Sequence, residues 1–282
     1  MSIGVEESYR YCRRLARRTG SNFYYSFYVL PAAKREAMCV IYAFMRRSDD
    51  IADGVANPAL ALEGLRKWRG EVAAAFANGP AREAILPAAA DVVRRFQIPT
   101  RHFLELLDGT EMDQTTSRYA TFADLYRYCY RVASCVGLIV LPIFGYASDE
   151  ALERGEACGI AFQLTNILRD VAEDARLGRI YLPLEDLRRF GVSEDDIMSS
   201  RATPQFVELM RFEAGRAREY YAKARPLVGL INRDSRRTLG VMIDIYEGIL
   251  DKIERSDFAV FDGKIKLSGA EKWGVVLKHL WR

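Results

Sequence analysis

Two short stretches of the sequence place aspartates four residues apart. The first, RRSDDIAD, contains Asp49 and Asp53, and the second, QLTNILRDVAED, contains Asp170 and Asp174. Residues four apart lie on one face of a helix, where two like charges destabilise it by about 0.2–0.5 kcal/mol. Both pairs have largely apolar flanks, where an unpaired carboxylate is costly. We therefore expect another group to compensate for these charges.

A divalent metal ion is the simplest compensation, if the two helices face each other. Mg²⁺ keeps several waters, binds one or two carboxylates, and shares its other ligand positions with substrate phosphates. We expect Mg²⁺ at this site, with Mn²⁺ as an alternative. Arg46 and Arg169, which accompany the two pairs, suit phosphate oxygens because a guanidinium can donate two parallel hydrogen bonds.

A metal-bound diphosphate beside an apolar cavity indicates ionisation of an allylic diphosphate. The metal would act as a Lewis acid on the leaving group, and a dry pocket would protect the carbocation from water. Aromatic faces stabilise such a cation, and the chain contains 15 Tyr and 14 Phe. The nucleotide-binding fingerprints GxGxxG and GxxxxGK[ST] are absent.

The elements that must position these residues are predicted to be helices. Apolar residues keep helical spacing, and alternating strand-like runs are almost absent. Helix start signals occur at Asn57-Pro58, Thr100, Thr121 with Asp124, Ser193 with Asp196, Thr203-Pro204, and Ser268 with Glu271. We expect one all-α domain over residues 1–282, with about ten helices around a central apolar cavity.

Composition excludes several other classes of protein. A net charge of +3, without a basic stripe interleaved with aromatics, argues against a nucleic-acid partner. Five cysteines without a CxxC pair, and only two histidines, leave little material for a zinc site or a His-based triad. The arginines of the first helix are interpreted as a solvated face, with membrane apposition as the weaker alternative.

Targeting signals are also few. The N-terminus has no apolar core before its arginines, so we expect a cytoplasmic protein. The uncharged run 132–148 is at the lower length limit for a membrane span, but Pro142 and two glycines interrupt it. A buried helix is the favoured interpretation of this run.

Four motifs together resemble the squalene/phytoene synthase family: SNFYYSFYVLP, YAFMRRSDDIAD, YCYRVASCVG and AFQLTNILRDVAEDARLGRIYLP. Their order and spacing match over about residues 8 to 280. The resemblance implies the α-helical isoprenoid synthase fold. It also implies head-to-head condensation of two allylic diphosphates to a cyclopropylcarbinyl diphosphate.

The resemblance assigns roles residue by residue. The expected ligands of metal and diphosphate are Asp49, Asp53, Asp170 and Asp174. The expected phosphate contacts and their neighbours in the site are Arg46, Arg169, Gln163 and Asn166. The residues expected to assist diphosphate loss, deprotonation or cation stabilisation are Tyr42, Tyr128 and Tyr246, with Tyr128 favoured as the proton relay.

The resemblance also describes the tunnel and its entrance. The expected tunnel wall comprises Phe23, Ala133, Val136 and Gly137. Lys264 and Lys266 either close over the phosphates or belong to a solvated surface; both interpretations stay open.

The form of the motifs is closest to bacterial enzymes that act on farnesyl diphosphate. We expect two farnesyl diphosphates to give presqualene diphosphate, and onward reaction to squalene stays open, as does use of NADPH. The alternatives are a phytoene synthase acting on geranylgeranyl diphosphate and a dehydrosqualene synthase. Two alternatives to an enzyme of this kind stay open: a helical protein-binding module, and a catalytically silent family member that binds prenyl diphosphates.

The sequence also leads to expectations about assembly and location. The chain lacks the C-terminal membrane anchor of eukaryotic squalene synthases, so any membrane contact is expected to be peripheral, at the inner face. A monomer or a homodimer is expected.

Overall fold

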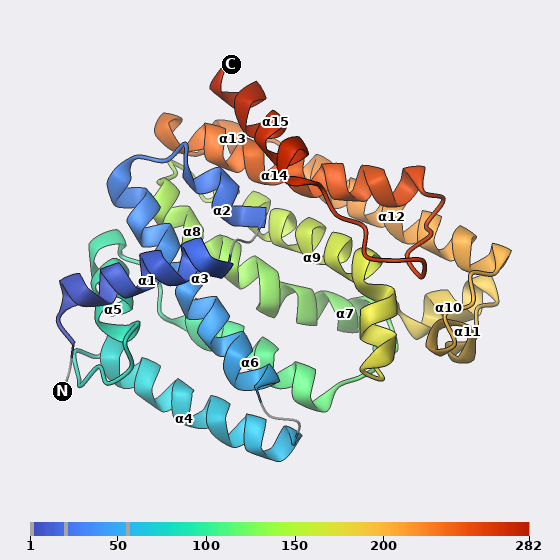
Figure 1. Ribbon diagram of the computed structural model, residues 1–282, viewed down its shortest axis with the longest axis horizontal. Coiled ribbons are helices and arrows are strands. Elements are labelled where there is room, and N and C mark those ends of the chain that lie inside the picture. The colour runs from blue at the N-terminus through green and yellow to red at the C-terminus, as the bar shows by residue number, and fades with distance from the viewer. Residues whose placement is uncertain (1–2, 20–21, 55–56, 282) are drawn as a thin grey trace.

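The computed structural model describes residues 3–19, 22–54 and 57–281, without the side chains of Asn22 and Phe23. The expected tunnel-wall role of Phe23 therefore lies outside the described side chains. Helices follow one another along the whole described chain (Figure 1). They are α1 (Val5–Thr19), α2 (Asn22–Phe27), α3 (Ala32–Asp53), α4 (Pro58–Phe76), α5 (Leu86–Phe96), α6 (Arg101–Thr115), α7 (Phe122–Cys129), the π-helix η1 (Tyr130–Ser134), α8 (Cys135–Phe144), α9 (Glu150–Arg176), α10 (Leu184–Phe190), α11 (Glu194–Met198), α12 (Pro204–Ala224), α13 (Leu227–Leu230), α14 (Arg233–Arg255) and α15 (Gly269–Leu280).

The predicted all-α class is confirmed. β-pairing within the described ranges is limited to isolated bridges. The described chain has more helical segments than the ten or so expected, because the short helices α2, α10, α11 and α13 occupy connections between long ones. The single-domain organisation stays a prediction.

The predicted start signals lie at helix N-termini, where they satisfy backbone N–H groups that have no partner inside the helix. The reciprocal capping boxes of α7, α11 and α15 are formed by Thr121 with Asp124, Ser193 with Asp196, and Ser268 with Glu271. Asn57 and Thr203 accept backbone hydrogen bonds at the starts of α4 and α12. Thr100 precedes α6 but its side chain makes no capping hydrogen bond.

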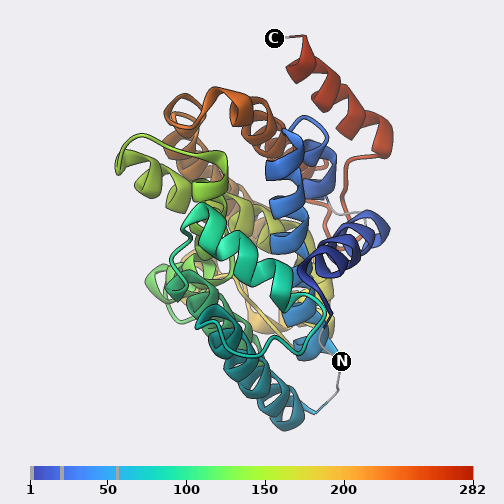
Figure 2. The same ribbon diagram turned by 90° about the vertical axis from the view of Figure 1, so that its left-hand side faces the viewer.

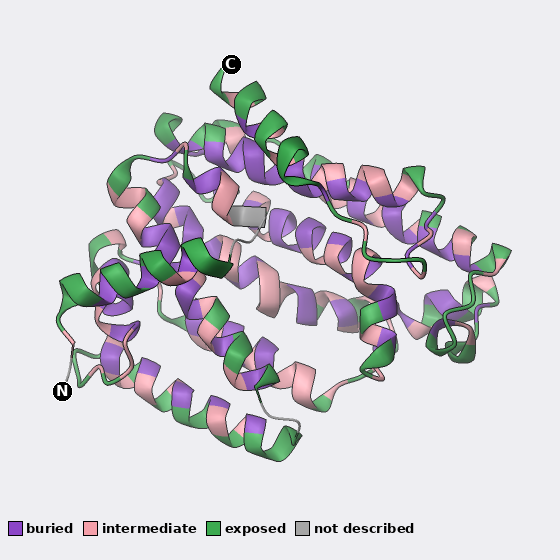
Figure 3. Ribbon diagram, in the orientation of Figure 1, coloured by how far each residue is buried: buried purple, intermediate pink, exposed green. Residues whose placement is uncertain are grey.

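Helix α9 forms the centre of the fold. It packs against α8, η1, α12 and α14, while α3 packs against α1, α4 and α8 (Figures 1 and 2). The buried apolar side chains form one continuous cluster. Figure 3 shows buried residues on the surfaces that the helices turn toward one another, with exposed residues on their outer faces.

Residues 132–144 of the apolar run belong to η1 and α8, and α8 ends at Phe144 with Gly145 as its C-cap. Together with α7, these two helices make a continuous helical stretch, Phe122–Phe144, long and apolar enough to cross a membrane by length and composition alone. More than half of its most apolar 18-residue window, 56%, is buried inside the fold. The structure thus places this run in the protein core, as the favoured interpretation predicted.

A glycine allows η1 to lie directly on α9. A Cβ atom added at Gly159 would be 2.4 Å from the Cα atom of Ser134, far inside van der Waals contact. Only glycine permits this approach of the two backbones. It brings Val132 and Ala133 of η1 next to the part of α9 that carries Gln163 and Asn166.

Candidate active site

A polar cavity of about 400 Å³ opens beside the C-terminal half of α3. Tyr42, Arg46, Asp49 and Asp53 line it from α3. Residues from four further helices complete it, among them Asp113 of α6, Tyr128 of α7, Val132 of η1, and Gln163 and Asn166 of α9. The structure thus brings together the first aspartate pair, two of the three predicted tyrosines and both predicted polar residues of α9.

An apolar cavity of about 140 Å³ adjoins the polar one. The predicted tunnel residues Ala133, Val136 and Gly137 line it. The two cavities share Met45, Val132, Gln163 and Asn166 as lining residues. A polar compartment therefore leads directly into an apolar one, as a substrate with a charged head and a hydrocarbon tail requires.

Asp113 lies at the centre of the site, although sequence reasoning did not select it. Its carboxylate accepts hydrogen bonds from the hydroxyls of Tyr128, at 3.1 Å, and Tyr181, at 2.8 Å. The two tyrosine rings stack with centroids 5.2 Å apart, and Tyr119 packs against both. Burial raises the pKa of the Asp113 carboxyl, while the hydrogen bonds from Tyr181 and Tyr128 act in the opposite direction.

A segment that follows α9 closes this side of the site. The backbone N–H of Ile180 donates to the carbonyl of Ser117 at 3.0 Å, which aligns the segment with the chain before α7. Arg179 thereby donates to the backbone carbonyl of Asp113 at 2.8 Å. Its guanidinium interacts electrostatically with both Asp113 and Asp53, so it lies between the acidic groups of α3 and α6.

Burial and neighbouring negative charges raise the pKa of one aspartate in each pair. Burial, together with the charge of Asp53, raises the pKa of Asp49 to about 7. Burial, together with the charge of Asp170, raises the pKa of Asp174 to about 7. Asp49 has substantial accessible surface, but that surface faces the cavity, so surrounding protein still reduces its solvation. The charge of Asp113, on α6, also raises the pKa values of both Asp49 and Asp174. Asp113 is therefore close enough to both acidic turns to interact with each electrostatically.

The second aspartate pair does not line the 400 Å³ cavity. Asp170 accepts a hydrogen bond from Arg169 at 2.8 Å and forms an ion pair with Lys264 at 3.2 Å. Lys264 also contacts Glu173 at 2.6 Å. Lys264 therefore provides a cation beside the second acidic turn, whereas Lys266 is exposed and has no ion pair in the ranges given above.

The remaining predicted residues take separate positions. Arg46 lines the polar cavity and pairs with Asp50 at 2.7 Å. Tyr246, on α14, is buried and its ring stacks on Phe162 at 4.4 Å. Tyr246 is close enough to Arg169 to interact with it electrostatically, and it does not line the polar cavity. It therefore lies near the second acidic turn.

The donor set fits a hard divalent cation. It consists of carboxylate oxygens with excess negative charge, and the buried Oδ1 of Asn166 has no hydrogen-bond partner. Among the described residues, the one cluster of three potential metal ligands is His102, Glu105 and Cys135, in which Glu105 is hydrogen-bonded to both other residues. The described carboxylates of the polar cavity thus form no cluster of three ligands around a common point. Mg²⁺ needs only one or two carboxylates alongside water and phosphate.

Asp113, Arg179 and Tyr181 were not selected from the sequence, although the sequence pattern around Asp113 indicated a role for it. Leu106, Thr110 and Asp113 lie four and three residues apart on α6 and all line the cavity. An aspartate in phase with a buried stripe was therefore visible in the sequence. Arg179 and Tyr181 belong to the motif GRIYLP, but only the pairing of Ile180 with the segment before α7 brings them to Asp113.

A helical bundle that joins a carboxylate-lined cavity to an apolar one is the arrangement of an enzyme that ionises prenyl diphosphates. The squalene/phytoene synthase family model matches residues 16–271. A phytoene synthase from Arthrospira platensis is 38% identical over 269 residues, covering 91% of this chain and 87% of that protein. A 15-cis-phytoene synthase from Synechocystis sp. is 38% identical over 270 residues, covering 92% and 80%.

Solved structures agree with these relatives. A dehydrosqualene synthase in complex with a ligand superimposes with a TM-score of 0.91 at 31% identity, covering 98% of this chain and 96% of that one. The squalene synthase HpnC from Alicyclobacillus acidocaldarius gives a TM-score of 0.84 at 32% identity, covering 90% and 95%. The chain belongs to the squalene/phytoene synthase family, whose members are head-to-head prenyltransferases that use divalent metal ions to bind diphosphate.

Proposed function

We propose that this chain condenses two molecules of an allylic prenyl diphosphate head to head, with Mg²⁺ as the metal. The observation that carries the reaction class is the adjacency of the polar and apolar cavities, which share Met45, Val132, Gln163 and Asn166 as lining residues. One diphosphate leaves, new carbon–carbon bonds form, and one proton is lost, which gives a cyclopropylcarbinyl diphosphate.

The acidic residues would hold the metal. They are Asp49, Asp53, Asp170 and Asp174, with Asp113 between the two pairs. When bound, the metal supplies Lewis acidity to the leaving diphosphate. Arg46 and Lys264 contact phosphate oxygens, and the apolar compartment excludes water from the ionised chain.

Tyr128 and Asp113 would accept the proton that the substrate loses. Burial, together with the charge of Asp113, raises the pKa of Tyr128 well above its usual value, so its hydroxyl is protonated and donates to Asp113. When the Tyr128 oxygen accepts the substrate proton, its own proton passes to the Asp113 carboxylate. The pair is thus a two-residue relay in the cavity wall.

The proposed substrate is geranylgeranyl diphosphate, which makes this chain a phytoene synthase. The C40 cyclopropylcarbinyl diphosphate would then lose its remaining diphosphate and a second proton, which gives the hydrocarbon phytoene without a reductant. This choice is supported by relatives that are phytoene synthases at up to 38% identity over nine-tenths of the chain. It replaces farnesyl diphosphate, which the form of the motifs favoured.

A second candidate is the farnesyl reaction, leading to presqualene diphosphate, dehydrosqualene or squalene. The specific observation in its favour is the TM-score of 0.91 with a dehydrosqualene synthase. The two candidates share every residue assigned above, because their first condensation differs only in the length of the apolar tail. Squalene as the end product would in addition need a hydride from NADPH.

Product analysis separates the candidates. The purified protein is incubated with geranylgeranyl or farnesyl diphosphate, each with Mg²⁺ and each with and without NADPH, and products are identified by mass. We expect a C40 hydrocarbon from geranylgeranyl diphosphate as the main output, and none when EDTA replaces Mg²⁺. A C30 main product would overturn the chain-length proposal. Absence of product from both substrates would overturn the enzymatic proposal.

A further inference from the structure

Helix α15 carries an apolar stripe on its outer face. Trp273, Leu277, Leu280 and Trp281 are 43%, 50%, 44% and 89% exposed. Their spacing of four, seven and eight residues places them on one side of the helix, and Val276, three residues after Trp273, is buried at the edge of that side, where α15 packs against α2 and α14. Large apolar side chains gathered in this way mark an interaction surface more often than an ordinary solvated face.

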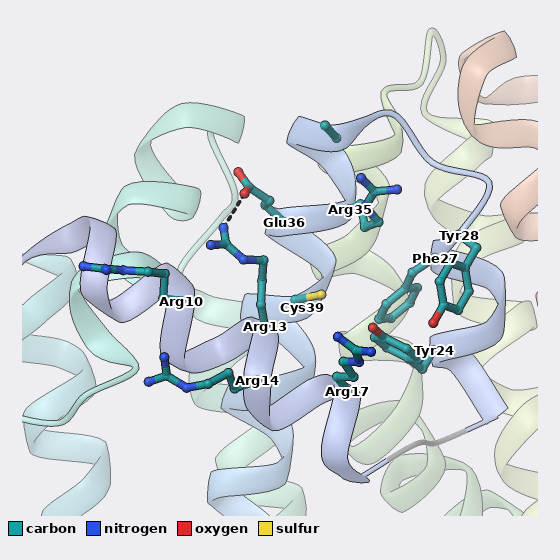
Figure 4. A pocket seen from close by; sticks show the side chains of 11 residues that line it. Arg10, Arg13, Arg14, Arg17, Tyr24, Phe27, Tyr28, Arg35, Glu36 and Cys39 are labelled. Carbon is teal, nitrogen blue, oxygen red and sulfur yellow. Dashed lines mark hydrogen bonds and ion pairs between the residues drawn. The ribbon is translucent and has the colours of Figure 1, made fainter.

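A basic groove lies next to this stripe. It has a volume of about 380 Å³ and is lined by Arg10, Arg13, Arg14, Arg17 and Arg35 of α1 and α3. Figure 4 shows these side chains, with Tyr24 of α2 and Tyr28, which directly follows α2, beside them. Glu36 is the one acidic residue in the lining, and it pairs with Arg13 at 2.5 Å. The other four arginines have no ion pair with any described residue.

Tyr28 joins the groove to the stripe. It lines the groove, is 49% exposed, and its ring lies 5.5 Å from that of Trp273. In Figure 2, α1 and α15 both project from the right-hand side of the molecule. The groove and the stripe therefore form one continuous surface, which we call the Arg–Trp face.

We propose that the Arg–Trp face docks the protein on the surface of an anionic phospholipid bilayer. Charge complementarity selects this occupant, because the four arginines without an ion pair to a described residue match the phosphates of lipid headgroups, which guanidinium groups bind bidentately. Basic residues near a bilayer are attracted to anionic lipid. A helix with tryptophan and leucine on one face lies in the interfacial plane with that face inserted.

The residues chosen for substitution lie outside the catalytic cavity. Arg35 of the groove and Asp49 of the cavity are both on α3, and 14 residues at 1.5 Å each put them about 21 Å apart along the helix. Arg10, Arg14, Leu277 and Trp281 line neither the polar nor the apolar cavity, so their substitution changes no residue that lines them. Docking is also independent of the proposed reaction, because it is measured without substrate.

Vesicle flotation tests the proposal. The full chain is mixed with vesicles of phosphatidylcholine alone, or containing about one third phosphatidylglycerol. We expect binding to the anionic vesicles only, weakened at least several-fold when salt rises from about 0.1 M to about 0.5 M. The variants R10E/R14E and L277S/W281S should each bind at least ten-fold more weakly.

Matched controls use exposed residues of α4, which lies at the opposite end of the molecule from α15 (Figures 1 and 2). R66E/K67E makes the same change in net charge as R10E/R14E, and L60S removes an exposed leucine. Both controls should bind within about two-fold of the wild type, and circular dichroism verifies the fold of every variant.

Three results would overturn the proposal. They are equal binding to neutral and anionic vesicles, equal loss of binding in the α4 controls, and no vesicle binding by the folded wild type. Gel filtration identifies the competing occupant: a dimer that L277S/W281S dissociates, without vesicle binding, would assign the face to a second copy of the chain.

Discussion

The hydroxyl of Tyr128 donates a hydrogen bond to the carboxylate of Asp113, with 3.1 Å between the two oxygens. Tyr128 was the tyrosine predicted to relay a proton, and Asp113 is the acceptor that completes the relay. Tyr181 donates to the other carboxylate oxygen, but it does not line the polar cavity. The two tyrosines therefore form a matched pair for experiment.

Tyr128→Phe should lower kcat about 100-fold, because a positioned proton-transfer group typically contributes that much or more. KM should change little, because the substituted hydroxyl binds Asp113 in the free enzyme. Tyr181→Phe removes a hydrogen bond from the same carboxylate, yet it should lower kcat less than about ten-fold. Steady-state kinetics measure both, and equal effects from the two variants would contradict the relay.

The stability of the metal-free protein should fall as the pH rises from about 4 to about 7. The carboxyls of Asp49 and Asp174 have pKa values of about 7 in the folded chain, against the ordinary aspartate pKa of 3.8. The folded state therefore binds more protons than the unfolded state in this range, and ionisation of these carboxyls opposes folding. Above about pH 7 this loss is complete.

Asp49→Asn should reduce that dependence. In EDTA, the variant should lose less stability than the wild type between about pH 5 and about pH 7.5, as measured by urea unfolding. Mg²⁺ should stabilise the wild type more at the higher pH, because metal ligands must be deprotonated. Identical pH dependence in the two proteins would show that Asp49 has an ordinary pKa.

Lys264→Ala should raise KM for the prenyl diphosphate about ten-fold, which corresponds to about 1.4 kcal/mol of lost binding. Lys264 already lies beside the second acidic turn, within 3.2 Å of Asp170, where a diphosphate would bind. Lys266→Ala is the control, because it removes an exposed lysine from the same segment. An unchanged KM in Lys264→Ala would assign Lys264 to a purely structural ion pair.

Gly159→Ala should destabilise the fold by about 1–3 kcal/mol, because the added Cβ would overlap the backbone of Ser134. Gly215→Ala should stabilise it by about 0.5–1 kcal/mol, because no atom lies within 4 Å of the added Cβ on the exposed side of α12. Urea midpoints measure both, and a stable Gly159→Ala would mean that η1 and α9 do not approach so closely.

The sequence predicted the helical class and many helix starts, because capping residues act locally. It also identified the first acidic pair, because a spacing of four is readable without knowledge of the tertiary structure. Asp113 was missed since it is a single aspartate on its helix face. Its role depends on Tyr128 and on Tyr181, which comes from 68 positions away in the chain.

Other features could not be predicted because they depend on tertiary packing. The arginines of α1 were interpreted as a solvated face, and nothing local indicates that α2 and α3 build a groove around them. Lys264 and Lys266 are equivalent by sequence, and the path of the segment before α15 decides that Lys264 reaches Asp170.

The central claim is that acidic residues of α3 and α9, linked by Asp113, hold divalent metal at the entrance to an apolar cavity. Anomalous diffraction from crystals grown with Mn²⁺ and a non-hydrolysable prenyl thiodiphosphate tests it most directly. We predict manganese bound to Asp49 or Asp53 and to Asp170 or Asp174, with the prenyl chain against Val136. Manganese found only elsewhere, or a prenyl chain outside the apolar cavity, would contradict the account.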